Sequence, residues 1–309
     1  MTPSAAKPAF LRERKPRGHE ALPPLPTYFR PAVERALAAA GGVELTAPAQ
    51  VSGIDGRRVG RRTGNALEFS EYREYRPGDD LRRIDWRVYA RSEQLMIKLY
   101  SEEIDPRCDV ILDHSASMAA TERKASAAIS LAAIFATAAA NSGFSLNLWH
   151  AADAFRKDPA PASPLLWDFP PFETPFSPSA NPASFSGQFF RRGIRILITD
   201  LMGPDDPAPV LSRLADGAKR AVVVMALDPL ELEPEPDANV LLVDAETGEE
   251  RELVIDEGAL ARYHERLERH RAMWAAAAAS RGVLLLPLSA ADFHPEIRPD
   301  ELFRAGLLK

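Results

Sequence analysis

Cysteine is nearly absent from this chain, since Cys108 is its single thiol. One thiol forms no internal disulfide and builds no cluster of thiolate ligands around a metal ion. The longest apolar stretch, residues 125–140, is alanine-rich and interrupted by hydroxyl residues. It falls short of the roughly 18 continuous apolar residues of a membrane helix. The basic N-terminus has no apolar segment behind it, unlike a secretory signal. We expect a cytoplasmic protein without membrane insertion.

A strong net charge is also missing. The formal charge of −6 over 309 residues is mild and does not indicate a nucleic-acid-binding protein. The charge is, however, unevenly spread. Residues 57–91 contain ten arginines and six acidic residues, whereas residues 200–257 contain sixteen acidic and four basic residues. Such asymmetry either steers a charged partner or reflects two regions that face each other.

Hydrophobic patterning predicts an α/β fold. Apolar residues make up 46% of the chain, enough for a substantial core. Short apolar runs that suit buried parallel strands alternate with longer segments of helical pattern. The predicted strands are 109–112, 145–150, 194–198, 221–227 and 283–287, and the predicted helices are 119–141, 206–216 and 257–281. This alternation predicts a Rossmann-like, mostly parallel sheet with helices on both faces.

The rest of the chain divides by composition. Before the α/β pattern we expect a helix at 31–40, a strand at 94–100 and a β-rich extension. Eight prolines make 158–182 an irregular loop, and residues 240–243 and 251–255 flank a predicted hairpin. The expected domains are a disordered 1–26, a helix and β-rich, arginine-rich subdomain 27–104, an α/β domain 105–290 and a C-terminal tail 291–309.

The main chemical signal is an Asp-x-Ser-x-Ser sequence formed by Asp113, Ser115 and Ser117. It follows the first strand of the predicted sheet, and Thr199 and Asp200 end another strand. Because the carboxyl ends of parallel strands meet at one edge, these side chains should converge. A carboxylate with hydroxyls suits Mg²⁺ or Mn²⁺. The alternative is that Asp113 caps the following helix while the serines bond to the turn backbone.

Other chemistries find no support in the sequence. Phosphate-binding glycine motifs and the HExxH zinc motif are both missing. Ser115 lacks the flanking glycines of a nucleophile elbow, and no general base is apparent. We expect surface or capping roles for His150, His264, His270 and His294. These absences predict a protein that is not an enzyme.

A second unusual segment runs from Gly64 to Arg91. Its Pro77-Gly78 pair predicts a turn, and arginines and aspartates alternate on both sides of it. One interpretation is a partner-binding surface with arginine and aromatic hot spots. The other is a latch in which arginine–carboxylate pairs hold the segment against the core. The residues concerned are Arg76, Asp79, Asp80, Arg82, Arg83, Asp85, Trp86 and Arg91.

Two family resemblances follow from these motifs. The turn with Asp200 resembles the metal-ion-dependent adhesion site of von Willebrand factor A-type domains. By that resemblance Asp113, Ser115 and Ser117 are its first element and Asp200 its last. Thr174 is the candidate for its middle threonine, because no other threonine lies between Thr137 and Thr199. The segment 64–91 resembles the signature of the domain of unknown function 58 family, whose members contain a von Willebrand A-like domain. The likeness covers roughly residues 45–290.

These resemblances imply a non-enzymatic protein-binding module. A partner's acidic residue would complete the shell of a bound Mg²⁺ or Mn²⁺, which the free chain binds alone or only with that partner. The implied partner is a MoxR-type AAA+ ATPase or its client, in protein maturation or assembly. Two alternatives remain open: a magnesium-dependent hydrolase using Asp113 and Asp200, and a scaffold with a vestigial metal site.

Overall fold

A computed structural model describes most of the chain, in two compact units. The described residues are 10–13, 25–46, 67–102, 106–151, 155–173, 189–203, 206–235 and 239–309. The larger unit contains residues 1–48 and 106–309, and the small unit contains residues 49–105.

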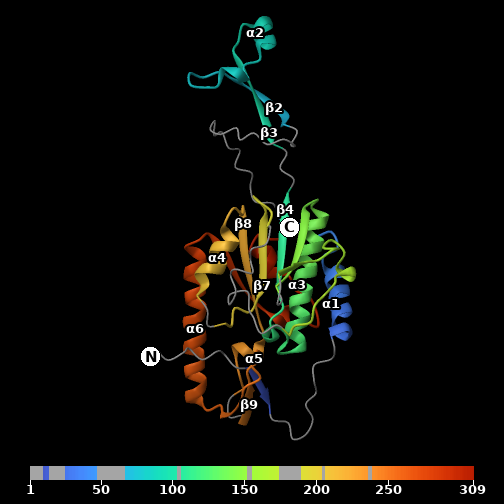
Figure 1. Cartoon of the computed structure of the whole chain (residues 1–309), viewed down its shortest axis with the longest axis vertical. Helices are drawn as coiled ribbons and strands as arrows, with labels where there is room; N and C mark the ends of the chain where they lie inside the picture. Colours follow the sequence, from blue (N-terminus) through green and yellow to red (C-terminus); the bar gives the residue numbers. More distant parts are fainter. Residues whose placement is uncertain are drawn as a thin grey trace. The chain divides into compact units, whose positions relative to one another are not determined.

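The larger unit is built on a six-stranded sheet with the strand order β11-β8-β7-β4-β5-β6 (Figure 1). Every neighbouring pair is parallel except β5 and the edge strand β6. This confirms the predicted mixed α/β fold with a mostly parallel sheet. The strands are β4 (Arg107–Asp113), β5 (Ser145–Ala151), β6 (Phe155–Lys157), β7 (Ile194–Thr199), β8 (Arg220–Leu227) and β11 (Val283–Ser289).

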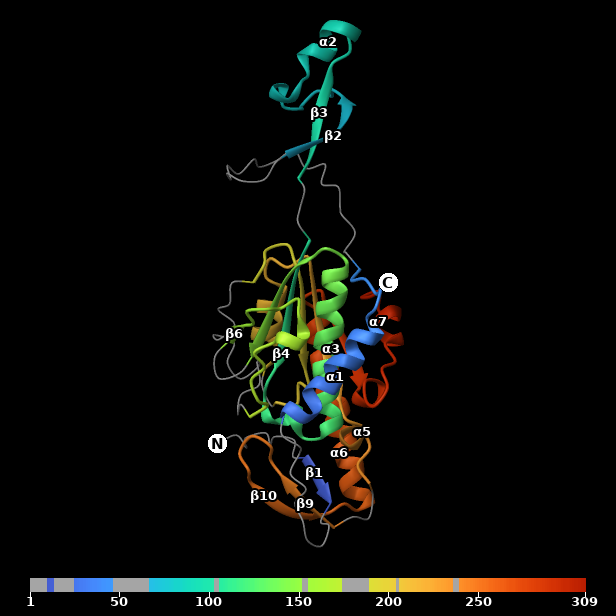
Figure 2. The same ribbon diagram turned by 90° about the vertical axis from the view of Figure 1, so that its right-hand side faces the viewer.

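Helices cover both faces of this sheet (Figures 1 and 2). Side chains alternate along β4, so that Val110 and Leu112 pack on one face while Ile111 packs on the other. The first face is covered by α1 and α3, and the second by α4 and α6. These helices are α1 (Leu25–Ala39), α3 (Glu122–Asn141), α4 (Pro207–Ala215) and α6 (Glu257–Ala279).

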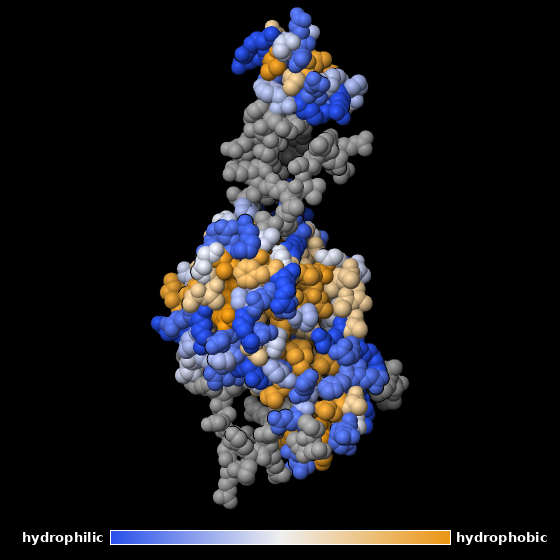
Figure 3. Space-filling model, turned by 180° about the vertical axis from the view of Figure 1, so that it is seen from behind, coloured by the Kyte–Doolittle hydropathy of each residue, from blue (hydrophilic) through white to orange (hydrophobic). Residues whose placement is uncertain are grey.

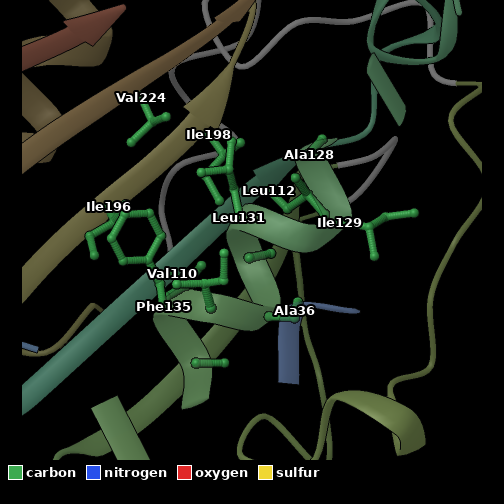
Figure 4. Packing of buried hydrophobic residues seen from close by; sticks show 14 of the residues in the cluster. Ala36, Val110, Leu112, Ala128, Ile129, Leu131, Phe135, Ile196, Ile198 and Val224 are labelled. Atoms are coloured by element: carbon green, nitrogen blue, oxygen red, sulfur yellow. The ribbon is translucent and has the colours of Figure 1, made fainter. Parts of the chain in front are cut away.

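Helix α3 is the centre of the core. Phe135, Leu131 and Ala128 of α3 lie against strands β4 and β7 (Figure 4). Its small alanines let α1 pack closely beside it, with Ala36 at the contact. By length and composition α3 is also apolar enough to cross a membrane, but 83% of that apolar window is buried inside the protein. A mostly buried core helix can also have the length and apolar composition of a membrane-spanning helix.

A second, three-stranded sheet in the larger unit has the order β1-β9-β10 and is antiparallel. Strands β9 (Asn239–Val243) and β10 (Glu250–Val254) form the predicted hairpin, and β1 (Phe10–Glu13) pairs with β9. Most of the segment predicted to be disordered, 1–26, lies outside the described residues. Helix α5 (Pro229–Leu232) follows β8.

The unit boundaries differ from the predicted domains. Helix α1 belongs to the larger unit, because its alanines are buried against α3. The predicted tail, 291–309, contains α7 (Asp300–Arg304), and its apolar residues Phe293, Leu302 and Leu307 are buried in the core. An apolar segment gains free energy by such burial, so the C-terminus is part of the domain.

The small unit has an antiparallel pair, β2 (Leu67–Glu74) and β3 (Met96–Glu102), with a bulge between Phe69 and Glu71. A 3-10 turn η1 (Leu81–Arg83) and a short helix α2 (Trp86–Ser92) connect the two strands.

Candidate functional site

The Asp-x-Ser-x-Ser residues come together in one turn at the carboxyl end of β4. The Ser115 N–H donates to Asp113 Oδ1 at 2.8 Å, and the hydroxyl oxygens of Ser115 and Ser117 lie 3.0 Å apart. All three side chains are buried. The chain then enters the 3-10 turn η2 (Ala116–Ala119), and the N-cap of α3 is Thr121. Asp113 therefore does not cap that helix.

The neighbouring strand β7 adds the hydroxyl of Thr199, which was expected to converge with Asp113 at this edge of the sheet. Thr199 donates its hydroxyl to Asp113 Oδ2 at 2.7 Å, so both oxygens of that carboxylate are held. Thr174, the candidate from the resemblance, lies outside the described residues. The position of Thr199 directly before Asp200 at a strand end is the sequence signal for this contact, whereas the family resemblance alone pointed to Thr174.

Lys124 is an unpredicted member of the site. Its side chain is fully buried, and its Nζ donates to Asp200 Oδ2 at 2.8 Å and to Glu231 Oε1 at 2.7 Å. The other oxygen of Asp200 accepts the Met202 N–H at 3.0 Å. Nothing in the alanine-rich sequence of α3 marks this lysine as inward-facing, because lysine is almost always solvent-exposed.

Glu231 is itself held by a capping box at the start of α5. Its Oε2 accepts the Asp228 N–H at 2.7 Å, and Asp228 caps the helix. Arg123 in turn donates to both carboxylate oxygens of Asp228, at 2.9 and 2.6 Å. A continuous polar network thus connects β7, α3 and α5.

Burial and neighbouring charges shift the pKa values of these groups. Burial, with the negative charge of Asp200 adding to it, raises the pKa of Asp113 to about 7. Burial also raises the pKa of Glu231 to about 7. It acts in the same direction on Asp200, but the Lys124 ammonium outweighs it and lowers the pKa of Asp200. Lys124 stays charged, because its two carboxylates outweigh the effect of burial and raise its pKa.

Two buried histidines, one in the turn and one in β5, form hydrogen bonds beside the site. His114 Nε2 lies 2.9 Å from His150 Nδ1, and His150 Nε2 lies 3.0 Å from Asp158 Oδ2. The ring of His114 stacks on Phe172. The expected surface or capping role of His150 is therefore wrong, because the chain buries it between two polar partners. Burial lowers the pKa of both histidines.

The donor types limit what this site can bind. Within the described ranges, no group of three or more His, Cys, Asp and Glu side chains could hold a metal ion. A cation at the turn would therefore need serine hydroxyls among its ligands. Hydroxyl and carboxylate oxygens are hard donors, which suit Mg²⁺ or Mn²⁺ rather than a thiophilic metal.

In the small unit, the predicted aspartates stabilise turns. Asp79 accepts bonds from the Arg73 guanidinium and the Arg76 N–H, both at 2.8 Å. The bond from Arg73 lowers the pKa of Asp79. Asp80 caps η1 and Asp85 caps α2 through backbone N–H groups.

Unlike these aspartates, several arginine side chains of the segment form no bond that stabilises a turn within the described residues. Among the described residues, Arg82, Arg87 and Arg91 form no ion pair, so the predicted latch of alternating charges is not formed by these three side chains. The side chain of Arg83 lies outside the described residues. Helix α2 has no buried residue, and Trp86 is 61% exposed. Figure 3 shows hydrophobic residues at the surface of the small unit beside hydrophilic ones.

One family match covers both part of the small unit and the Asp113 turn. Residues 71–163 match the family described as "Protein of unknown function DUF58". The match extends from β2 through the turn and α3, and it confirms the predicted resemblance to this family over those residues.

Mycobacterial relatives extend the similarity beyond that segment. The chain is 27% identical over 229 residues to the uncharacterized proteins Rv1480 of Mycobacterium tuberculosis (strain H37Rv) and Mb1516 of Mycobacterium bovis. The alignments cover 69% of this chain and 72% of each relative.

Among solved structures, the conserved hypothetical protein BatB from Bacteroides thetaiotaomicron aligns over 65% of this chain and 95% of its own. The identity is 11% and the TM-score is 0.32, a likeness that carries no argument about the fold.

Proposed function

We propose that this chain is a non-enzymatic protein-binding module with a divalent cation at the carboxyl edge of its sheet, in the manner of a von Willebrand A-type domain. The observation that carries the proposal is the convergence of Asp113, Ser115 and Ser117 in one turn, with the two hydroxyl oxygens 3.0 Å apart. Thr199 fixes the carboxylate of Asp113 from the next strand. In this arrangement the two serines and Asp113 hold Mg²⁺ or Mn²⁺, which supplies an open coordination position for a partner's Asp or Glu.

The charges at the site favour an added cation. Within the described residues, the network contains the buried carboxylates of Asp113, Asp200 and Glu231 and one ammonium, that of Lys124. Buried charges without compensation are costly, and proteins balance them by pairing or by metal binding. A divalent ion at the serine hydroxyls would stabilise the ionised form of Asp113, whose pKa burial raises to about 7.

The arginine-rich face of the small unit is the second contact surface in this proposal. Trp86, Arg82, Arg87 and Arg91 are exposed, and an aromatic residue surrounded by arginines is the composition of an interface hot spot. The family resemblance implies a MoxR-type AAA+ ATPase or its client as the partner. Because these arginines form no ion pair within the described part of the chain, the matching surface of the partner should be acidic.

The scaffold alternative has one observation in its favour. Lys124 already provides a positive charge beside Asp200, so the edge of the sheet has a cation of its own. In that case the domain would bind its partner without metal. The hydrolase alternative has no such support, because His114 of the turn and His150 of β5 are buried and bond to each other, and His150 also bonds to Asp158.

The proposal is tested by binding to a purified MoxR-type ATPase, measured in Mg²⁺ and in EDTA. Ser115→Ala with Ser117→Ala should weaken binding in Mg²⁺ at least about tenfold, as loss of the hydroxyl ligands removes the shared cation. The matched control is Ser126→Ala with Ser130→Ala, two buried serines of α3. Binding that is equal in EDTA, or unaffected by the turn variant, would contradict a shared cation.

A further inference from the structure

The fully buried Lys124 is the feature of the site that its motif does not account for. Its ammonium lies between two carboxylates from different elements, Asp200 after β7 and Glu231 on α5. A buried lysine needs such partners to remain charged. The structure therefore places a permanent positive charge at the edge of the sheet beside Asp200, which also hydrogen-bonds to the side chain of Ser117 in the Asp113 turn.

This ammonium changes what Asp200 can do. Oδ2 of Asp200 accepts the Lys124 ammonium, so its charge is already paired, whereas both bonds to Asp113 come from neutral donors. Asp200 is the residue that the motif would offer to a metal. A unit positive charge beside it also repels a second cation.

We propose that Lys124 is the built-in cation of this site, which withdraws Asp200 from the metal ligands and holds the divalent affinity low. The inference rests on the proposed cation at Asp113, Ser115 and Ser117. A site with low intrinsic affinity depends on a partner's carboxylate to complete it, because that carboxylate adds the negative ligand that Asp200 does not provide. Lys124 thereby makes cation binding conditional on the partner.

Glu231 positions the lysine. It accepts from the ammonium through Oε1, while Oε2 is fixed by the Asp228 N–H in the capping box of α5. The ammonium therefore bonds to α5 as well as to Asp200. The capping box at the start of α5 fixes the position of the Glu231 carboxylate that accepts this bond.

The test is a calorimetric titration of Mn²⁺ into the metal-free full chain and its variants. Lys124→Met keeps an unbranched side chain that is one atom shorter and removes the charge, so Asp200 is released. We expect the Mn²⁺ affinity to rise at least about tenfold, which corresponds to about 1.4 kcal/mol. The matched control is Lys219→Met, which removes an exposed lysine charge just before the amino end of β8 and leaves the pair of Lys124 and Asp200 intact. The affinity of this control should equal that of the wild type.

Lys124→Met leaves two buried carboxylates without their ammonium and could unfold the chain. Lys124→Met with Glu231→Gln removes one charge of each sign, and circular dichroism identifies which variant is folded. Tighter Mn²⁺ binding by a folded variant supports the inference even if the free wild type binds no metal, because the inference makes binding by the wild type depend on the partner. If neither the wild type with its partner nor any folded variant binds Mn²⁺, the proposed function and the inference are both refuted. If the wild type binds and the folded variants bind no tighter, the inference is wrong while the proposed function stands.

Discussion

The carboxylate of Asp113 is fully buried, and two donors hold its oxygens, the Thr199 hydroxyl and the Ser115 N–H. These bonds set the direction in which the carboxylate faces. At the scale of single residues, the geometry of the turn therefore depends on a threonine of the neighbouring strand.

Thr199→Val should lower the free energy of unfolding by about 1–3 kcal/mol, because it leaves an oxygen of a buried carboxylate without its donor. Urea unfolding measures this change. The control is Thr137→Val in α3, since the Thr137 hydroxyl has no hydrogen-bond partner within the described residues. The same substitution there should be nearly neutral. Equal losses at the two positions would contradict the role given to Thr199.

His150 gives a pH-dependent prediction. Burial lowers its pKa in the folded chain despite the opposing effect of Asp158, so the unfolded chain binds the proton more readily. The stability that this residue contributes is present above its unfolded pKa, roughly 6.5, and is lost as the pH falls below it.

His150→Gln keeps a donor for Asp158 and removes the titration. We expect the stability advantage of the wild type over His150→Gln to be larger at pH 8 than at pH 5.5, as measured by urea unfolding at both values. An advantage that grows on acidification would show that His150 is protonated in the folded chain.

At the scale of elements, α3 connects the core with the site. Its N-terminal turn contributes Lys124 to the polar network, and its later turns pack Phe135 and Leu131 on the sheet (Figure 4). The helix therefore positions the turn before it through core packing.

Phe135→Ala should destabilise the larger unit by about 3–5 kcal/mol, because the lost ring leaves a cavity between α3 and the sheet. Chemical denaturation tests this expectation. Phe303→Ala is the control, since Phe303 of α7 is 40% exposed and its removal creates no buried cavity. A loss below that of the control would mean that the core around Phe135 is loosely packed.

The elements were largely predictable from the sequence, and the site was predictable only in part. Buried strands such as 194–198 and the hairpin around Gly248 have local signals, namely apolar runs and turn residues. The position of Asp113 beside Thr199 follows from the topology of a parallel sheet. Lys124 and His150 were not predictable in their roles, because pairing of buried polar groups depends on residues distant in sequence, such as Glu231.

At the scale of the whole molecule, charge is segregated along the sequence. The arginine-rich segment contains α2, which buries none of its residues within the described structure. Such a helix buries little apolar surface, and the proposed function gives its aromatic and basic residues a role at an interface.

Arg87→Glu with Arg91→Glu should weaken binding to the purified ATPase and reduce its dependence on salt, because the reversed charges repel an acidic surface. Surface plasmon resonance at two ionic strengths measures both effects. The control is Arg262→Glu with Arg266→Glu on α6, which makes the same change of charge on another exposed helix. If both pairs weaken binding equally, the effect is one of net charge and not of α2.

In the proposed function, a divalent cation binds at the turn after β4. Its most direct test is calorimetric titration of Mg²⁺ and Mn²⁺ into the metal-free wild type, into Asp113→Asn and into the control Asp109→Asn, a buried aspartate at the opposite end of the same strand. Binding by the wild type and the control that is lost in Asp113→Asn is the predicted result. Equal binding by all three proteins, or no binding by the wild type with or without its partner, would contradict the claim.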